Sequence, residues 1–289
     1  MRAAVVRERG GMPAILVTGA STGIGEACAL HLASQGQLVF AGVRKEADAE
    51  HLERDGRGRI VPVILDVTDH ATIEAAVKTV RDRSGTTRFA GVVNNAGVAR
   101  GGPLEYLAID EWRDQLEVNV IGQVAVTQAF FPLIREGGGR IVFIGSIGGR
   151  LGTPLMGPYC ASKFALEGIA ESLRHELHDA GIKVALVEPG AVKTEIWSKG
   201  RETSERLQAE ASPEMLERYG AQIQKVLDSI ERNDRNGVAP IAVAKAVEHA
   251  LFATHPRARY LVGTDAKAGG LLARILPDGV KDAVLRKLG

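Results

Sequence analysis

Short apolar runs rich in β-branched residues recur along the chain and alternate with longer segments of helical periodicity. The runs lie at 14–17, 38–43, 60–65, 91–93, 140–144, 183–187 and 259–262. They are nearly continuous in apolar residues, as strands buried on both faces of a parallel sheet must be, and the segments between them are long enough for crossover helices. The pattern predicts an α/β fold with a doubly wound sheet of about seven parallel strands and helices on both faces.

Two regions depart from this alternation. The segment at about 195–238 is rich in charge and helix formers, with Ser212 and Pro213 as a helix start. The tail at about 264–289 extends past the last predicted strand. Because the chain has no internal repeat and no low-complexity linker, we expect a single domain over residues 1–289 that carries both additions.

The composition and net charge of the chain argue against some classes of binding partner. With 289 residues, 45% hydrophobic content and a net charge of +1, the chain has no strong field for nucleic acid or an anionic membrane, so a small molecule is the expected partner. Cys28 and Cys160 are not spaced as a metal cluster and the histidines show no metal-ligand pattern, so we expect no metal. The first residues lack the apolar core of a signal peptide, and no apolar run approaches the roughly 20 residues of a membrane span, which predicts a cytoplasmic protein.

The sequence TGASTGIG follows directly after the first predicted strand. Gly19, Gly23 and Gly25 therefore fall where a strand turns into a helix. Glycines at such a turn adopt backbone angles that other residues avoid, and they let a pyrophosphate approach the N–H groups at the positive end of the helix. The spacing GxxxGxG differs from the common GxGxxG fingerprint. A tight corner without a ligand is the alternative.

The residues after this turn bear on the choice of dinucleotide. A carboxylate about 20 residues after the glycines would bind both ribose hydroxyls and repel a 2′-phosphate. No Asp or Glu occurs from Ala27 through Lys45, and the second strand ends in AGVRK, so Arg44 and Lys45 are available to a phosphate. We therefore expect NADP(H), with NAD(H) as the second choice. An ordinary solvated strand end is the alternative interpretation of the two cations.

The stretch PYCASK places Tyr159 and Lys163 four positions apart, so on a helix both side chains project from one face. A free phenol has a pKa of about 10 and is a poor base at neutral pH. A nearby ammonium and a positive nicotinamide favour the phenolate and would lower that pKa. We therefore expect Tyr159 to be the general acid/base, which takes the alcohol proton in oxidation and returns it in reduction.

The order TGASTGIG, LDVTD, NNAG, Asn119, Ser146 and YCASK resembles that of the short-chain dehydrogenase/reductase family, over roughly residues 14–195 and weakly to about 263. The resemblance implies a Rossmann-type fold in which Asp66 and Val67 contact the adenine and PGAVKT, ending at Thr194, contacts the nicotinamide amide. The implied cofactor-binding residues are Gly19, Ser21, Thr22, Gly23, Ile24, Gly25, Arg44, Asp66, Val67, Asn95, Ala96, Gly97, Tyr159, Lys163, Pro189, Gly190, Val192 and Thr194.

The same resemblance implies Asn119, Ser146, Tyr159 and Lys163 as the catalytic residues. Ser146 would hydrogen-bond the substrate oxygen, and Lys163 would also grip the nicotinamide ribose. Asn119 would hold a water through which the proton reaches solvent. Each residue alone also fits a structural role, as a packing tyrosine, a solvated lysine, a turn-forming serine or a helix-interior asparagine. Their combined spacing favours catalysis.

Three segments expected around the reactive end of the cofactor are mainly apolar. Their side chains include Val98, Leu151, Leu155, Met156, Ile196 and Trp197. Few charged groups converge there, which predicts an apolar alcohol or ketone as substrate. The tail AGGLLARILPDGVKDAVLRKL, together with VFAGVRK and PRARYLVGTDA, resembles the retinol and hydroxysteroid dehydrogenase branch. That resemblance implies a steroid, retinoid or similar substrate and a substrate lid over about 195–238.

Assembly and alternative functions stay open at this point. The segments at 111–131 and 159–173 are apolar on more than one side, which predicts a homodimer or homotetramer. We expect the tail after Gly270 to cover the substrate site, to join a subunit contact or to lie on a membrane surface, in that order. The alternative functions are an NAD(H)-dependent dehydrogenase of a small secondary alcohol and a catalytically weak dinucleotide-sensing protein. A methyltransferase would not need the tyrosine, lysine and serine together.

Overall fold

The computed structural model describes residues 12–194 and 211–288 of the chain. Its centre is a parallel sheet of seven strands in the order β3-β2-β1-β4-β5-β6-β7, which confirms the doubly wound prediction. The strand order reverses between β1 and β4, the place where ligands bind at the carboxyl ends of such sheets. The strands are β1 (Ala14–Val17), β2 (Leu38–Val43), β3 (Ile60–Ile64), β4 (Phe89–Asn94), β5 (Arg140–Ile144), β6 (Lys183–Pro189) and β7 (Arg259–Val262).

All seven predicted runs are strands, and two of them are longer than predicted. Phe89 begins β4 because it pairs with Ala14 of β1. Pro189 ends β6 beside Val262 of β7, so the strand continues into the PGAVKT sequence. The last residue of β6 is therefore also the first residue of the segment that, by the resemblance, contacts the nicotinamide.

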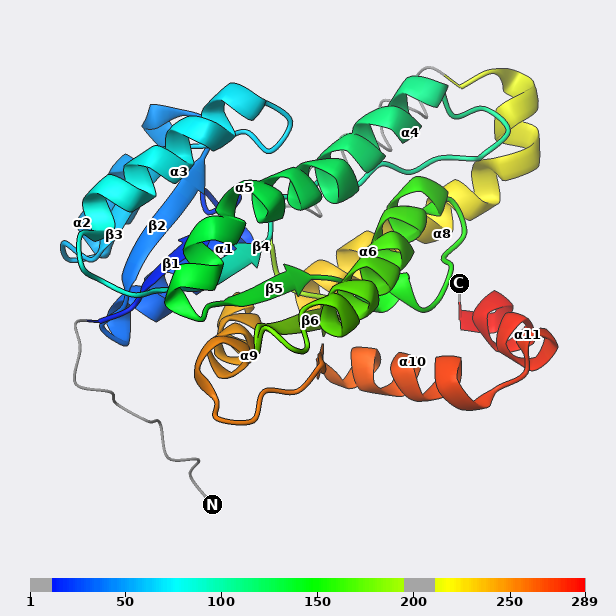
Figure 1. Cartoon of the computed structure of the whole chain (residues 1–289). Helices are drawn as coiled ribbons and strands as arrows, with labels where there is room; N and C mark the ends of the chain where they lie inside the picture. The colour runs from blue at the N-terminus through cyan, green and yellow to red at the C-terminus, as the bar shows by residue number, and fades with distance from the viewer. Residues whose placement is uncertain (1–11, 195–210, 289) are drawn as a thin grey trace.

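Helices cover both faces of the sheet (Figure 1). They are α1 (Gly23–Ser34), α2 (Glu50–Asp55), α3 (His70–Ser84), α4 (Ile109–Leu116), α5 (Gly122–Gly137), α6 (Gly157–Glu176), α8 (Pro213–Asn236), α9 (Pro240–Phe252), α10 (Thr264–Ile275) and α11 (Asp278–Leu288). One apolar core joins the sheet to α1 and α9, and the other joins it to α3, α5 and α6. Cys28 lies in the first core, and both it and Cys160 are buried free thiols.

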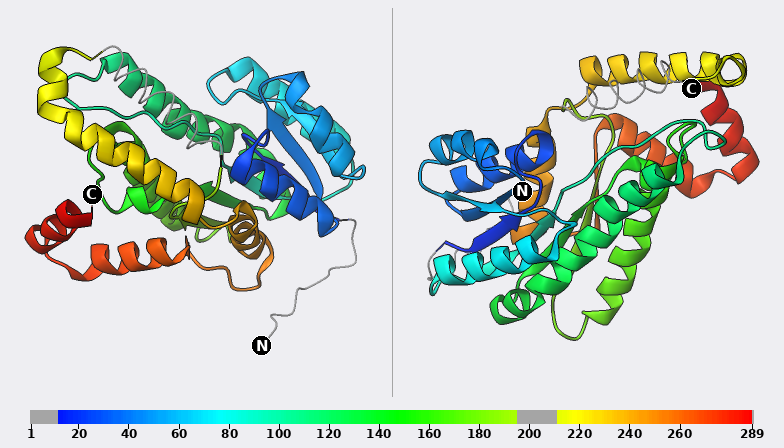
Figure 2. Two further views of the ribbon diagram at one scale, coloured as in Figure 1. Left: turned by 180° about the vertical axis from the view of Figure 1, so that it is seen from behind. Right: turned by 90° about the horizontal axis from the view of Figure 1, so that it is seen from above.

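The two additions to the alternating pattern are helical where the structure describes them. Ser212 caps α8 by accepting a hydrogen bond from the Met215 N–H at 3.2 Å, and Pro213 is the first helical residue, as predicted. Figure 2 shows α8 as a long helix set apart from the sheet. The tail forms α10 and α11, which follow β7. Ile196 and Trp197 lie outside the described residues.

One helical stretch differs from the expectation that no segment could span a membrane. Ile109–Gly137, which joins α4 to α5, has a mean hydropathy of 1.2 over 18 residues and is long enough to cross a bilayer by length and composition alone. Its apolar residues are interrupted by polar ones, so no continuous run marks it in the sequence. Its buried side chains, such as Phe130 and Ile134, belong to the apolar core under the sheet.

Candidate functional site

The glycine turn lies between β1 and α1, at the point where the strand order reverses. Gly19 has φ of +61° and Gly23 has φ of +62°, a region that favours glycine. A Cβ on Gly25 would overlap the carbonyl oxygen of Gly19, so this position also requires glycine. Thr22 precedes α1 without a side-chain cap. The first N–H groups of a 12-residue helix are thus left to an anion, which fits a dinucleotide pyrophosphate.

The NNAG sequence after β4 fixes this turn. The Asn95 side chain donates to the carbonyl oxygens of Thr18 and Gly19 at 3.0 and 2.9 Å. The Thr18 hydroxyl in turn accepts from the N–H groups of Asn95 and Ala96, each at 3.0 Å. A Cβ on Gly19 would lie 2.8 Å from the Ala96 Cα, so the two segments are in contact. Gly97 follows, and its Cβ position lies 3.2 Å from the Asn119 Oδ1.

The end of β2 lies beside the same turn, because the Ala20 N–H donates to the Gly42 carbonyl at 2.9 Å. Arg44 and Lys45 follow β2 as exposed side chains. Neither takes part in an ion pair with a residue that the structure describes. Two cations without anionic partners at this strand end suit the 2′-phosphate of an adenosine ribose.

Asp66 and Val67 follow the neighbouring strand, β3. The Asp66 carboxylate accepts from both the N–H and the hydroxyl of Thr68, at 2.9 and 2.8 Å, which holds its loop. Val67 is buried against Gly122 at the start of α5. The structure thus brings these two residues to the same sheet edge as the glycine turn, and their contact with the adenine stays a prediction.

The PGAVKT segment meets the glycine turn from the other side of the switch point. The Gly190 N–H donates to Val262 and the Lys193 N–H donates to Val238, each at 3.0 Å, so the segment is fixed between β7 and the start of α9. A Cβ on Gly23 would lie 3.2 Å from the Thr194 side chain. The contact between Gly23 and Thr194 therefore joins the PGAVKT segment to the glycine turn.

Tyr159 and Lys163 share one face of α6 next to the end of β5. The Lys163 Nζ lies 5.7 Å from the centroid of the Tyr159 ring and donates to the Ile144 carbonyl at 2.8 Å. Ser146 follows β5, is buried, and accepts from the Gly148 N–H at 3.0 Å. Its hydroxyl also hydrogen-bonds the Tyr159 phenol. The structure therefore brings the predicted tyrosine, lysine and serine together.

The surroundings of Tyr159 in the protein raise the pKa of its phenol, whereas the expected effect of the ammonium and nicotinamide charges was to lower it. Loss of water around Tyr159 raises its pKa above the usual value, and the hydrogen bond from Ser146 offsets only part of that rise. Burial also lowers the pKa of Lys163 to about 8, so its amine carries less charge than an exposed lysine. The expected lowering rested on a full ammonium charge and on the nicotinamide cation. The protein groups alone keep Tyr159 protonated at neutral pH.

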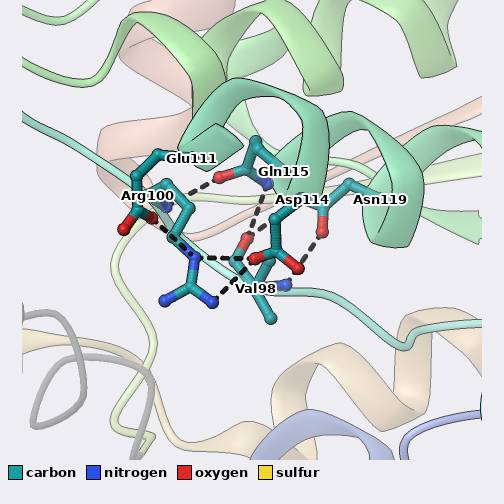
Figure 3. Close-up of polar contacts among 6 residues, drawn as sticks. All are labelled: Val98, Arg100, Glu111, Asp114, Gln115 and Asn119. Atoms are coloured by element: carbon teal, nitrogen blue, oxygen red, sulfur yellow. Dashed lines mark hydrogen bonds and ion pairs between the residues drawn. The ribbon is translucent and has the colours of Figure 1, made fainter. Parts of the chain in front are cut away.

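Asn119 lies in a π turn, Glu117–Ile121, between α4 and α5, and its side chain is nearly saturated (Figure 3). Its Oδ1 accepts from the Val98 N–H at 2.8 Å, and its Nδ2 donates to the Val98 carbonyl at 3.0 Å and to the Ser162 hydroxyl at 3.1 Å. These bonds leave one Oδ1 lone pair for a water. Asn119 thus ties the loop after β4 to the helix that carries Tyr159, and its water-holding role stays a prediction.

The same loop is held by charged residues that the sequence reasoning did not single out (Figure 3). Arg100 pairs with Asp114 at 2.7 Å and with Glu111 at 3.3 Å. The buried Gln115 accepts from the Arg100 N–H at 2.7 Å and donates to the Val98 carbonyl at 2.9 Å. A fully buried glutamine in a helix is visible only once the fold is known, because its sequence context is that of a charged surface helix.

A second missed cluster surrounds Glu188 on β6. Its side chain is fully buried and pairs with Arg150, at 2.6 Å, and with Arg259, at 3.2 Å. Arg150 ends the turn that begins at Ser146, and Arg259 also contacts Glu167 of α6. One sign of this cluster is visible in the sequence, because Glu188 is a carboxylate within the mainly apolar run KVALVEP and a buried carboxylate needs a partner.

An apolar pocket of about 30 Å³ lies next to the helix with Tyr159. Its lining joins two loops and α8, through Gly101, Gly102, Pro103, Leu155, Met156, Ile223 and Val226. Leu155 and Met156 are thus among the predicted substrate-facing residues that the structure places at a pocket. Leu151 is buried against α10 at Gly269.

The family of short chain dehydrogenases matches residues 13–205. Mouse (Mus musculus) retinol dehydrogenase 5 is 36% identical over 97% of this chain and 91% of its own length. An NADPH-dependent 3-dehydrocapnine reductase of Ornithobacterium rhinotracheale is 35% identical over 94% and 95%. A 17-beta-hydroxysteroid dehydrogenase type 6 of Bos taurus is 35% identical over 94% and 87%. The chain belongs to the short-chain dehydrogenase/reductase family, in its retinol and hydroxysteroid dehydrogenase branch.

Solved structures agree with this assignment. A short-chain dehydrogenase/reductase of Burkholderia phymatum in complex with NAD matches with a TM-score of 0.76 and 27% identity, over 91% of this chain and 92% of that one. A short-chain dehydrogenase of Burkholderia cenocepacia in complex with NADP matches with a TM-score of 0.72 and 26% identity, over 95% and 98%. The chain is therefore an oxidoreductase of alcohol and carbonyl groups with a nicotinamide dinucleotide as cofactor.

Proposed function

We propose that this chain is an NADP(H)-dependent oxidoreductase that interconverts a hydroxyl and a carbonyl on an apolar substrate, with Tyr159 as the general acid/base. The observation that carries the proposal is the meeting of Tyr159, Lys163 and Ser146 at the carboxyl edge of the sheet, beside the glycine turn. The proposal includes a single domain over residues 1–289, with a lid at about 195–238 and an extension at about 264–289.

The residues around the glycine turn fit a nicotinamide dinucleotide, because the start of α1 has no side-chain cap. When bound, the cofactor supplies or accepts hydride. Gly19 through Gly25 would hold the pyrophosphate, Asp66, Val67 and Asn95 through Gly97 would border the adenosine half, and Pro189 through Thr194 would border the nicotinamide.

The protein's own part in the reaction is proton transfer and orientation. Because burial raises the pKa of Tyr159, the phenol holds its proton at neutral pH and is ready to donate it to a developing alkoxide in carbonyl reduction. Ser146 would donate a hydrogen bond to the substrate oxygen. Lys163, with a pKa of about 8, keeps most of its charge at pH 7 and favours the phenolate that donation leaves behind. Asn119 would connect this group to solvent.

Two features support the finer choices of cofactor and substrate. Arg44 and Lys45 favour NADP(H), in line with the NADPH-dependent 3-dehydrocapnine reductase among the relatives, while NAD(H) is the alternative. The names of the relatives support a steroid, retinoid or similar substrate, and the mainly apolar lining of the small pocket beside α6 supports an apolar one. A small secondary alcohol with NAD(H), or dinucleotide sensing with little turnover, are the alternative functions.

Location and assembly are part of the same proposal. A cytoplasmic protein that forms a homodimer or homotetramer fits the apolar side chains Ile121 and Phe164, which are exposed on the helical layer of α5 and α6. The exposed side chains of Leu271 and Ile275 on α10 leave peripheral membrane contact as a further option for the tail.

A titration tests the cofactor assignment first. Purified protein is titrated with NADPH, NADH and S-adenosylmethionine while nicotinamide fluorescence and thermal stability are followed, and steroid, retinoid and aliphatic carbonyls are then offered with NADPH. We expect NADPH to bind most tightly and Arg44→Ala to weaken NADPH about tenfold more than NADH, because it removes a charge-assisted phosphate contact. Tightest binding of the methyl donor would overturn the oxidoreductase proposal, and an unchanged NADPH to NADH ratio would overturn the role of Arg44.

A further inference from the structure

Asp265 joins the C-terminal extension to the PGAVKT segment. It lies in the first turn of α10, in the sequence GTDA that the proposed reaction does not use. Its Oδ2 accepts a hydrogen bond from the Ala191 N–H at 2.7 Å, across 74 positions of the chain. A hydrogen bond to a carboxylate is stronger than one between neutral groups. The extension therefore reaches the loop that borders the nicotinamide side of the proposed cofactor site.

Two glycines make room for this carboxylate. A Cβ on Gly190 would overlap the Asp265 carboxyl group, and a Cβ on Gly263 would overlap its Oδ1. Gly263 also has φ of +107°, which L side chains rarely adopt. The carboxylate is thus seated in a notch of backbone that both turns form. The Asp265 residue is exposed to solvent, so its hold on the loop comes from this fit together with the hydrogen bond to Ala191.

The hydrogen bond between Asp265 and Ala191 adds to the backbone hydrogen bonds along the segment 190–194. The Gly190 N–H donates to Val262 and the Lys193 N–H donates to Val238, each at 3.0 Å. Asp265 supplies the partner of the Ala191 N–H, which lies between these two. Thr194 then lies against Gly23 of the glycine turn. Without the carboxylate, Ala191 would lose the bond at its N–H, while its carbonyl would still accept from the Val238 N–H at 3.0 Å.

We propose that Asp265 is a positioning residue for the dinucleotide site: its carboxylate holds the Ala191 amide and thereby fixes the segment 190–194 against the glycine turn. The proposal rests on the proposed function for the identity of the ligand. In this proposal the first turn of α10 helps to position the cofactor-binding segment, in addition to any role of the extension in covering the substrate site. A flexible segment would have to be ordered each time the dinucleotide binds, which weakens binding.

The test compares Asp265→Ala and Asp265→Asn with wild-type protein. The amide oxygen of asparagine still accepts a hydrogen bond, whereas alanine cannot. We expect Asp265→Ala to raise the NADPH dissociation constant about fivefold, and Asp265→Asn to fall between it and wild type. Hydrogen exchange of the ligand-free protein is measured in parallel, where Asp265→Ala should speed exchange in the 189–194 peptide and leave β1 and β4 peptides unchanged.

Asp278→Asn is the matched control, because it removes one carboxylate from the same extension, and among the residues that the structure describes this carboxylate pairs with Lys281 alone. It should leave both readouts at wild-type values. The proposal is overturned if Asp265→Ala binds NADPH like wild type, or if exchange in the 189–194 peptide is unchanged. If wild-type protein bound no nicotinamide dinucleotide, the proposed function would fail, while the exchange data would still decide whether Asp265 holds the loop.

A double-mutant cycle tests the contact itself. Gly190→Ala places a methyl group against the Asp265 carboxyl, so it should weaken NADPH binding. In the Asp265→Ala background that overlap is gone, and the same change should weaken binding by a smaller factor. Equal factors in both backgrounds would contradict the contact, whatever the stability of either single variant.

Discussion

The proposed cofactor end of the site is built on the sheet, whereas the proposed substrate end is built on helices outside it. At the cofactor end, Asn95, Thr18 and Lys163 each bond backbone groups of a neighbouring strand or turn. At the substrate end, α8 buries Met215, Ile223 and Ile230 but is joined to the loop at 103–107 through exposed side chains. The backbone contacts at the sheet hold the reacting side chains in one position, whereas the exposed contacts of α8 allow the shape of the pocket to adapt to different substrates.

The contact between α8 and that loop illustrates the difference. Glu105 accepts from Arg218 and from the Tyr219 hydroxyl, each at 2.9 Å, and the Tyr106 and Tyr219 rings meet edge to face at 6.0 Å. About half of the Glu105 and Arg218 side chains is exposed, at 47% and 52%. Solvent screens such a pair, so it is worth far less than a buried one.

The largest effect on stability is expected at Glu188. Glu188→Ala leaves the half-buried Arg150 without its carboxylate, while Arg259 still pairs with Glu167, so we expect a loss of about 3 kcal/mol of unfolding free energy. Urea unfolding measures it. Glu136→Ala removes an exposed partner of Arg81 and should lose less than about 1 kcal/mol. Equal losses in the two variants would contradict the difference between a buried and an exposed carboxylate.

Lys163 gives a pH-dependent effect of similar size at the cofactor end. Its pKa of about 8 in the folded protein lies below the value of 10.5 for a free side chain. Between these pH values the unfolded chain binds the proton and the folded chain does not, so the unfolding free energy of wild type rises with pH there. Relative to Lys163→Met, wild type should gain about 2 kcal/mol from pH 8 to pH 10 and stay level below pH 7. A difference that does not change with pH would contradict the burial of the amine.

The glycine turn should respond next. Gly25→Ala places a methyl group against the Gly19 carbonyl and the Asn95 amide, so we expect NADPH binding to weaken about thirtyfold. Gly168→Ala is the control, because a Cβ at that position of α6 would meet open space. Fluorescence titration compares the two. Wild-type affinity in Gly25→Ala would show that the turn tolerates a side chain and does not approach the pyrophosphate.

The smallest effect is expected at the contact between Glu105 and Arg218 of α8. Glu105→Gln keeps the size of the side chain but removes its charge, so we expect a change of about 0.5 kcal/mol in unfolding free energy and about a twofold rise in substrate KM. Asp110→Asn, in an exposed pair with Arg113, is the control. A KM change above about tenfold would mean that the substrate end is held as firmly as the cofactor end.

The sequence predicted the sheet because parallel strands bury both faces and so read as continuous apolar runs. It predicted the glycine turn, Tyr159 and Lys163 because their roles depend on local spacing. The contacts of Asp265 with Ala191 and of Glu188 with Arg150 and Arg259 could not be predicted, since they join residues far apart in the chain. The rise that burial causes in the pKa of Tyr159 could not be predicted, because it depends on the packed surroundings, and the lowering by a bound nicotinamide stays a prediction.

Turnover by Tyr159→Phe tests the central claim most directly. The variant keeps the ring and removes the hydroxyl, so NADPH should bind within about twofold of wild type while carbonyl reduction falls about a thousandfold. Tyr260→Phe, whose hydroxyl bonds His249 and the Arg257 N–H on the far side of β7, should keep its turnover. Wild-type turnover in Tyr159→Phe with NADPH bound would contradict the assignment of that phenol as the proton donor.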